Sequence, residues 1–77
     1  MSGDLVILKD GQFLADLTTK GVRWTPEYPD AMKFAALTKT KSIARRIPGS
    51  MVIKNFGQDD QQTMEVIPSR TSATNNA

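Results

Sequence analysis

The sequence contains no cysteine and no histidine among its 77 residues. The first absence excludes disulfide bonds and thiol nucleophiles, and the second excludes the imidazole acids and bases of catalytic triads. Without sulfur or imidazole ligands, a metal ion would have to be held by oxygen atoms alone. We therefore expect no metal, no other cofactor and no disulfide in this protein.

Other motifs of enzyme active sites are missing as well. The carboxylates are scattered along the chain, and Asp59-Asp60 stands in a polar stretch that is typical of a turn. The glycines are isolated and form no phosphate-binding loop. The sequence therefore predicts a protein that is not an enzyme and that has no evident small-molecule substrate.

Long apolar runs are also absent. The run near the start covers only Leu5 to Leu8, whereas a signal peptide needs a longer apolar stretch and a membrane span needs about 20 residues. The lack of cysteine is compatible with a reducing compartment. We expect a soluble, cytoplasmic protein that does not associate with membranes.

The short length allows a single domain, which we place at residues 4–67. Residues 68–77 contain no large apolar side chain, so we expect them to form a disordered C-terminal tail. A core of this size rarely supplies more than about 3–5 kcal/mol of net stability. Because disulfides are excluded and no metal is expected, self-association is the remaining way to add stability, and a homodimer is one hypothesis for a partner.

Short apolar segments alternate with turn residues in the first third of the chain. Residues 5–8 and 13–17 flank Asp10-Gly11, which is a strong hairpin signal. Residues 22–25 follow a second turn and predict a third short strand. After two prolines, Asp30 is expected to cap a short helical turn over residues 31–34.

Residues 13–17 alternate in the way expected of a strand with one buried face. Alternation at period two places Phe13, Ala15 and Leu17 on one face of this strand. It places Leu14 and Asp16 on the opposite face. We therefore expect Leu17 to share the environment of Phe13.

A helix is predicted from Thr38, as the N-cap, to about Ile47, where Pro48-Gly49 ends it. Residues of one stripe recur at helical spacing, and this stripe has to be buried against a sheet. Residues 51–56 and 64–67 predict two further strands. The expected fold is α+β in the order ββ(β)αββ, a small antiparallel sheet of three to five strands with one helix packed on one face. The stripe consists of Leu37, Thr40, Ile43, Ala44 and Ile47.

Positive charge is concentrated in the middle of the chain. Between Ala31 and Gln58 there are six cationic side chains and no acidic one, while all eight acids lie outside this segment. One interpretation is the solvated face of an ordinary amphipathic helix. Another is a surface for nucleic-acid phosphates, and a third is a site for an acidic protein. The cations of the predicted helix are Lys39, Lys41, Arg45 and Arg46.

Trp24 is the largest apolar side chain and also has two interpretations. It packs in the core or at its edge, or it serves as a contact that stacks on a nucleic-acid base or anchors a protein partner. The sequence thus predicts a small non-enzymatic binding module whose nucleic-acid site would comprise Trp24 and the four helical cations. The alternative is a module for protein–protein interaction or homodimerisation with no nucleic-acid role.

A sequence pattern in residues 5–56 resembles that of small phage- or prophage-encoded proteins of Gram-positive bacteria, whose role is unassigned. The resemblance implies a hairpin and a tryptophan followed by a turn, a helix and a closing strand. Its motifs form the core, so it implies a shape and a phage origin but assigns no functional residue. The pattern consists of Trp24-Thr25, Asp30-Ala31-x-x-Phe34, Ile43-Ala44 and Ile47-Pro48-Gly49 followed by Met51-Val52-Ile53.

Overall fold

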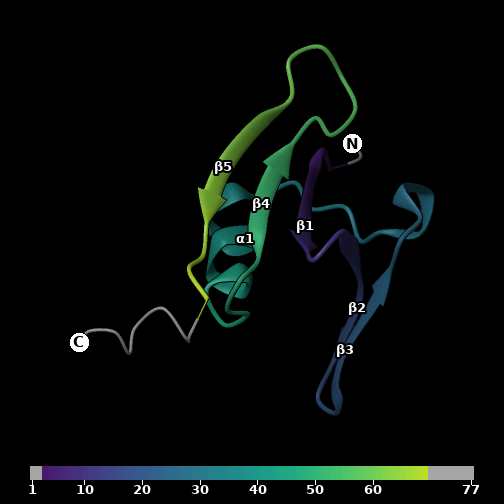
Figure 1. Ribbon diagram of the computed structural model, residues 1–77, viewed down its shortest axis with the longest axis vertical. Helices are drawn as coiled ribbons and strands as arrows, with labels where there is room; N and C mark the ends of the chain where they lie inside the picture. Colours follow the sequence, from purple (N-terminus) through teal and green to yellow (C-terminus); the bar gives the residue numbers. More distant parts are fainter. Residues whose placement is uncertain (1–2, 70–77) are drawn as a thin grey trace.

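The computed structural model describes residues 3–69, which form a five-stranded antiparallel sheet and one α-helix (Figure 1). The strands are arranged in the order β3-β2-β1-β4-β5. This is a small α+β fold, as predicted, and the element order agrees with the prediction, including the third strand before the helix. The elements are β1 (Leu5–Lys9), β2 (Gln12–Thr18), β3 (Gly21–Thr25), the 3-10 helix η1 (Tyr28–Asp30), α1 (Leu37–Ala44), β4 (Met51–Lys54) and β5 (Gln62–Val66).

The turn between β1 and β2 forms at Asp10-Gly11, as the sequence predicts. Both residues have positive φ, 51° for Asp10 and 80° for Gly11, and they join the paired residues Lys9 and Gln12. Positive φ at both central positions is the geometry that matches the right-handed twist of hairpin strands. Asp tolerates this conformation and Gly adopts it without steric cost.

The middle of the sheet is formed by β1, which pairs with both β2 and β4. Val6 and Ile7 are completely buried although they point to opposite faces of the sheet. Ile7 packs in one cluster with Leu14, Ala44 and Val52. This double burial explains why the first apolar run does not alternate with polar residues.

On the face of Val6, three aromatic rings form a second cluster. Phe13 makes edge-on contacts with Tyr28 and Phe56, with ring centroids 5.6 and 4.8 Å apart. Lys33 lies over the Tyr28 ring, with its Nζ 4.5 Å from the centroid. The same ammonium group donates hydrogen bonds of 2.9 Å to the carbonyl oxygens of Tyr28 and Ala31. Lys33 is therefore part of this loop and does not belong to a basic surface of the helix.

Helix α1 begins and ends earlier than predicted. Ala36 is the N-cap, with an extended backbone, so the prediction of Thr38 at this position is wrong. Thr40, which is fully buried, donates from its hydroxyl to the Ala36 carbonyl at 2.7 Å. At the other end, Ser50 donates from its hydroxyl to the carbonyls of Ala44 and Ile47. Thr40 and Ser50 thus stabilise the two ends of the helix through hydrogen bonds to backbone carbonyls. A prediction with Thr38 as the N-cap does not include these hydrogen bonds.

The segment after η1 is extended, so the predicted helical turn over residues 31–34 is wrong. Met32 donates its backbone N–H to the Leu14 carbonyl at 2.9 Å. Phe34 exchanges two backbone hydrogen bonds with Leu5, of 3.1 and 2.9 Å. Pairing with the sheet therefore uses the backbone groups that a helical turn would need.

A β-bulge in β2 changes the face on which Leu17 lies. Leu14 pairs with Trp24 and Asp16 pairs with Arg23, so Ala15 is an extra residue on β2. Beyond the bulge, Leu17 pairs with Val22, which shares a face with Trp24. The prediction that Leu17 shares a face with Phe13 is wrong, because the bulge turns Leu17 to the face of Leu14.

The predicted boundary between the domain and the tail, after Ile67, lies two residues before the end of the described residues. Ile67 is buried. The backbone N–H of Gly49 donates to the carbonyl oxygens of Ile67 and Pro68, with N···O distances of 3.1 and 3.3 Å. The greater part of the predicted tail, residues 70–77, lies outside the described residues. The disorder of the tail therefore stays a prediction.

Candidate interaction surface

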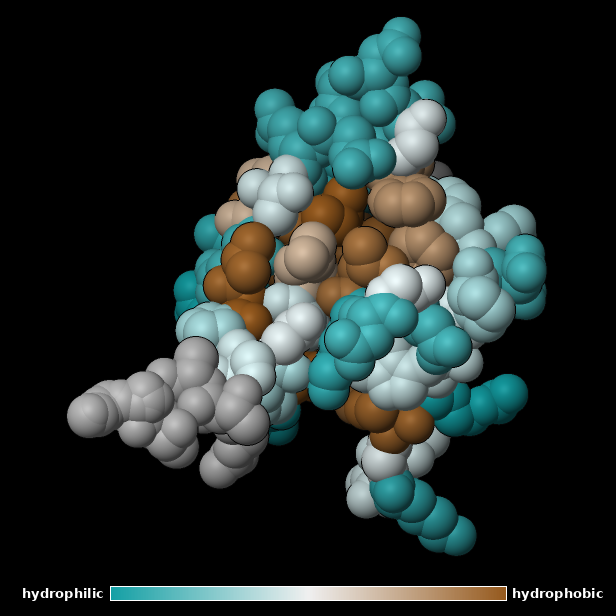
Figure 2. All heavy atoms as spheres, viewed as in Figure 1, coloured by the Kyte–Doolittle hydropathy of each residue, from teal (hydrophilic) through white to brown (hydrophobic). Residues whose placement is uncertain are grey.

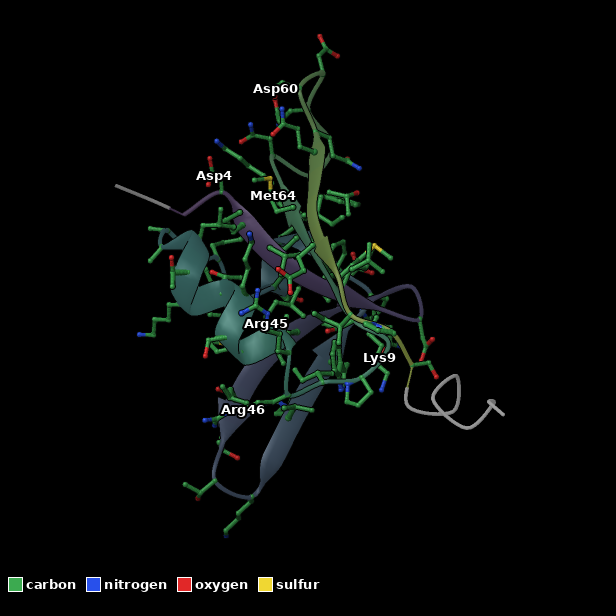
Figure 3. The ribbon with its side chains drawn as sticks, turned by 90° about the vertical axis from the view of Figure 1, so that its left-hand side faces the viewer. Asp4, Lys9, Arg45, Arg46, Asp60 and Met64 are labelled. Carbon is green, nitrogen blue, oxygen red and sulfur yellow. The ribbon has the colours of Figure 1, made fainter. Side chains whose placement is uncertain are left out.

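The cations of the predicted helix divide into two pairs on different flanks. Lys41 and Arg45 are four residues apart, and Lys39 and Arg46 are seven apart, so each pair follows the helical repeat along its own flank. Figure 3 shows Arg45 beside β5, whereas Arg46 lies at the end of α1 near the hairpin of β2 and β3. The four cations predicted as one site therefore do not form a single cluster.

Glu65 on β5 forms ion pairs with both cations of the first pair and offsets part of their charge. Its carboxylate accepts hydrogen bonds from two guanidinium nitrogens of Arg45, at 2.7 and 3.0 Å. The ammonium group of Lys41 lies 3.7 Å from the same carboxylate. A bidentate arginine–carboxylate pair has a defined geometry and holds both side chains in place. Lys41 and Arg45 are thus less available to a phosphate than the sequence suggests.

The ion pair also changes the titration of both partners. The hydrogen bond from Arg45 is the main cause that lowers the pKa of Glu65 below its ordinary value, with the charges of Arg45 and Lys41 acting in the same direction. The hydrogen bond with Glu65 raises the pKa of Arg45. The carboxylate therefore stays ionised to a lower pH than an isolated glutamate does.

The second pair has no such partner. Lys39 and Arg46 are both exposed, and within residues 3–69 the ion pairs of the α1 cations involve only Lys41 and Arg45. Uncompensated cations on one flank attract negative charge. Of the four helical cations predicted from the sequence, these two are the ones available to an anionic group.

Trp24 packs against the core. It is half-buried, lies opposite Leu14 across the β2–β3 pair and borders the cluster that contains Ile7 and Ala44. This agrees with the interpretation of Trp24 as a residue at the edge of the core. The base-stacking role stays a prediction, and no contact described here supports it.

An apolar groove lies between the β2–β3 hairpin and α1. It encloses about 600 Å³ and is lined by Leu17 and Val22 from the hairpin and by Ile43, Arg46 and Ile47 from the helix and the turn after it. We call this the hairpin–helix groove. Leu17 is 43% exposed and Val22 is 38% exposed. Large apolar side chains with this exposure, facing further apolar side chains across a groove, are typical of an interaction site.

Hydrophobic side chains extend onto the hairpin beyond the body of the sheet, as Figure 2 shows. A second hollow, of about 580 Å³, adjoins the groove and is lined by Lys39, Ser42 and the shared residues Ile43 and Arg46. The residues that line the two hollows include two cations and no acid. The surface next to the groove is therefore positively charged.

Sequence reasoning found the cations of this surface but missed its apolar part. Leu17 and Val22 stand on either side of the turn at residues 18–21, and their exposure depends on the bulge in β2. The apolar residues that flank this turn are visible in the sequence. Their position opposite Ile43 and Ile47 requires the tertiary structure.

No protein-family model, no curated protein and no solved structure matches this chain. The resemblance to phage-encoded proteins therefore stays a prediction. In the part of the chain that the structure describes, no three acidic residues gather closely enough to hold a metal ion. Across residues 3–69, no helix has the length and hydrophobicity required to cross a membrane.

Proposed function

We propose that this protein is a small, non-enzymatic, cytoplasmic module that binds another protein through the hairpin–helix groove. In this proposal α1 packs on one face of the sheet and forms one wall of the groove. The burial of Ala44 in one cluster with Ile7, Leu14 and Val52 supports that packing. The view of Figure 1, in which α1 lies behind β4 and β5, agrees with it.

The observation that carries the proposal is the exposed cross-strand pair Leu17–Val22, which faces Ile43 and Ile47 across the groove. Burying a side chain such as Leu or Val contributes about 1.5–3 kcal/mol. A partner that covers this pair would gain part of that free energy. Protein interfaces commonly have such an apolar centre with a charged rim.

Nucleic-acid binding is the second candidate, and the exposed pair Lys39 and Arg46 favours it. Four phosphate contacts would give a slope of log affinity against log salt of roughly −3 to −4, whereas two would give only roughly −1.4 to −1.8. The ion pairs of Lys41 and Arg45 with Glu65 thus weaken this candidate.

Selection of peptides from a displayed random library tests the protein-binding proposal. We expect selected peptides to shift the NMR amide signals of Leu17, Val22 and Ile43. Binding should fall at least about fivefold in a Leu17→Ser/Val22→Ser variant, because the apolar contact is lost. Val66→Ser is the matched control, since Val66 is 61% exposed but lies on β5.

Peptides that bind the double variant and the original protein equally would contradict the proposal. Failure to select any peptide would contradict it as well. Fluorescence anisotropy with generic single- and double-stranded nucleic acids, at low and moderate salt, tests the second candidate. No binding at low salt would exclude it, and binding with a steep salt dependence would favour it.

A further inference from the structure

The surface next to the hairpin–helix groove has a charge pattern that restricts the partner. The groove and the adjoining second hollow share Ile43 and Arg46 and together form one continuous surface. Its apolar part consists of aliphatic side chains, and its charged part consists of Lys39 and Arg46. A complementary partner would therefore combine aliphatic and acidic side chains.

The two cations are separated by a defined distance. Arg46 is seven positions after Lys39 and lies two residues beyond the end of α1, and seven positions of a continuous helix would correspond to about 10 Å along its axis. Two carboxylates spaced by two helical turns, or by three residues of an extended chain, span about the same distance. Both kinds of short peptide segment could therefore reach the two cations while an aliphatic side chain enters the groove.

The lining residues also distinguish a peptide from a nucleic acid. The residues that line the two hollows include no aromatic side chain. Single-stranded nucleic acids are usually bound by aromatic rings on which bases stack, together with cations along the backbone. An aliphatic groove with only two cations on its rim fits an acidic peptide better.

The end of this chain does not have the required chemistry. The sequence of residues 70–77 is RTSATNNA, with no acid and no large apolar side chain. It offers neither an anchor for the groove nor a carboxylate for Arg46. The aliphatic lining and the two cations favour a segment of another protein as the occupant.

We infer that the hairpin–helix groove binds an acidic, aliphatic segment of a protein partner. An aliphatic side chain of this segment lies against Leu17, Val22 and Ile43, and its carboxylates pair with Arg46 and Lys39. This inference rests on the proposed protein-binding function and adds the chemical class of the partner. It also gives the exposed cations of α1 a role in selecting that partner.

Charge reversal on peptides selected from the displayed random library tests this inference. We expect the peptides that bind the groove to be enriched in Asp and Glu together with Leu, Ile or Val. Arg46→Glu should weaken their binding about five- to tenfold, because an attraction becomes a repulsion. Replacing the peptide carboxylates with Lys should restore binding to the Arg46→Glu variant and weaken binding to the original protein.

Arg23→Glu is the matched control for this experiment. Arg23 is exposed and lies on β3, but its side chain is on the face opposite Trp24, away from the groove. The control should leave peptide affinity within about twofold, and Lys39→Glu should repeat the effect of Arg46→Glu. Circular dichroism and thermal unfolding verify that each variant is folded.

The outcomes separate the inference from the proposed function. Selected peptides that bind the groove but are neutral or basic would overturn the acidic class and leave the protein-binding function standing. Failure to select any peptide would overturn both. Salt-dependent binding of duplex or single-stranded nucleic acid that is lost in both Arg46→Glu and Lys39→Glu, with no peptide binding, would assign the surface to nucleic acid instead.

Discussion

At the scale of single residues, Glu65 determines how much positive charge α1 exposes. Its side chain is only 20% exposed, and its carboxylate contacts both Lys41 and Arg45. Glu65 lies 20 residues from Arg45 in the sequence, so no local pattern indicates that the two side chains meet. The four-cation site predicted from the sequence therefore includes two cations, Lys41 and Arg45, that the fold pairs with Glu65.

Substitution of Glu65 by Gln should make stability less dependent on pH. The pKa of Glu65 is lowered from its ordinary value of 4.5 in the folded protein. Its ion pairs therefore stabilise the fold above pH 4.5, and this contribution is lost as the pH falls through the lowered pKa. Urea unfolding should show the original protein to be more stable than Glu65→Gln near neutral pH.

The difference between the two proteins should disappear in acid, because Glu65 is then protonated and resembles glutamine. Asp59→Asn provides a control, because it also replaces a carboxylate with an amide but Asp59 is exposed in the loop before β5. A stability difference for Glu65→Gln that stays constant from neutral to acidic pH would show that the ion pairs contribute nothing.

Ser50 is a second residue whose role depends on tertiary contacts. It is completely buried and donates hydrogen bonds to the Ala44 carbonyl at 3.0 Å and the Ile47 carbonyl at 2.7 Å. Replacement by Ala would remove the hydroxyl donor and leave each carbonyl with its backbone donor alone, the Ile47 N–H for Ala44 and the Ser50 N–H for Ile47. We expect Ser50→Ala to lower the free energy of unfolding by about 0.5–1.5 kcal/mol, as measured by urea denaturation.

Ser42→Ala is the matched control, because Ser42 is exposed on α1. It should change the free energy of unfolding by less than about 0.5 kcal/mol. Equal effects of the two substitutions would mean that the hydrogen bonds of Ser50 do not hold the end of the helix.

At the scale of elements, the sequence signals for local structure were strong in the β1–β2 hairpin and weak in the β2–β3 hairpin. Asp10-Gly11 predicts the first turn because both residues accept positive φ. The bulge at Ala15 has no comparable signal, since alternation at period two continues through it in the sequence. Cross-strand pairing decides where the extra residue lies, and this decides which face Leu17 occupies.

The first turn should be sensitive to the backbone conformation at Gly11. A Cβ at this position would meet no other atom within 4 Å, but the φ of 80° is unfavourable for alanine. We expect Gly11→Ala to lower the free energy of unfolding by about 1 kcal/mol, measured by chemical denaturation. Gly11→Asn is the control and should cost less, because Asn tolerates positive φ.

A Gly11→Asn variant as unstable as Gly11→Ala would contradict this argument. The loss would then have a cause other than the backbone conformation. Since no atom lies near the added Cβ, a steric clash would not explain it. The comparison thus isolates the conformational requirement of the turn.

At the scale of the whole molecule, the sheet has buried clusters on both faces, and the hairpin extends beyond one of them. Leu5, Ile7 and Val52 belong to the cluster that contains Ala44, while Val6 and Ile53 belong to the aromatic cluster. The core residues could be predicted from the sequence because many of them lie in short, strongly apolar segments. It did not indicate the groove, because an exposed apolar pair differs from a core pair only in its tertiary surroundings.

Leu14 and Leu17 provide the test of where the core ends and the binding surface begins. Both residues lie on β2 and on the same face, but Leu14 is completely buried and Leu17 is 43% exposed. Leu14→Ala should cost about 2–5 kcal/mol, because the cluster that contains Ile7 and Val52 would lose a large side chain. Domains of this size have only roughly 3–10 kcal/mol of total stability, so much of the protein would unfold.

Leu17→Ala should cost less than about 1 kcal/mol, because water already reaches much of this side chain. Thermal and urea unfolding of both variants measures the two costs on one strand. A loss for Leu17→Ala as large as that for Leu14→Ala would show that Leu17 belongs to the core. The hairpin–helix groove would then be a structural contact, and a binding partner would have no apolar surface to cover there.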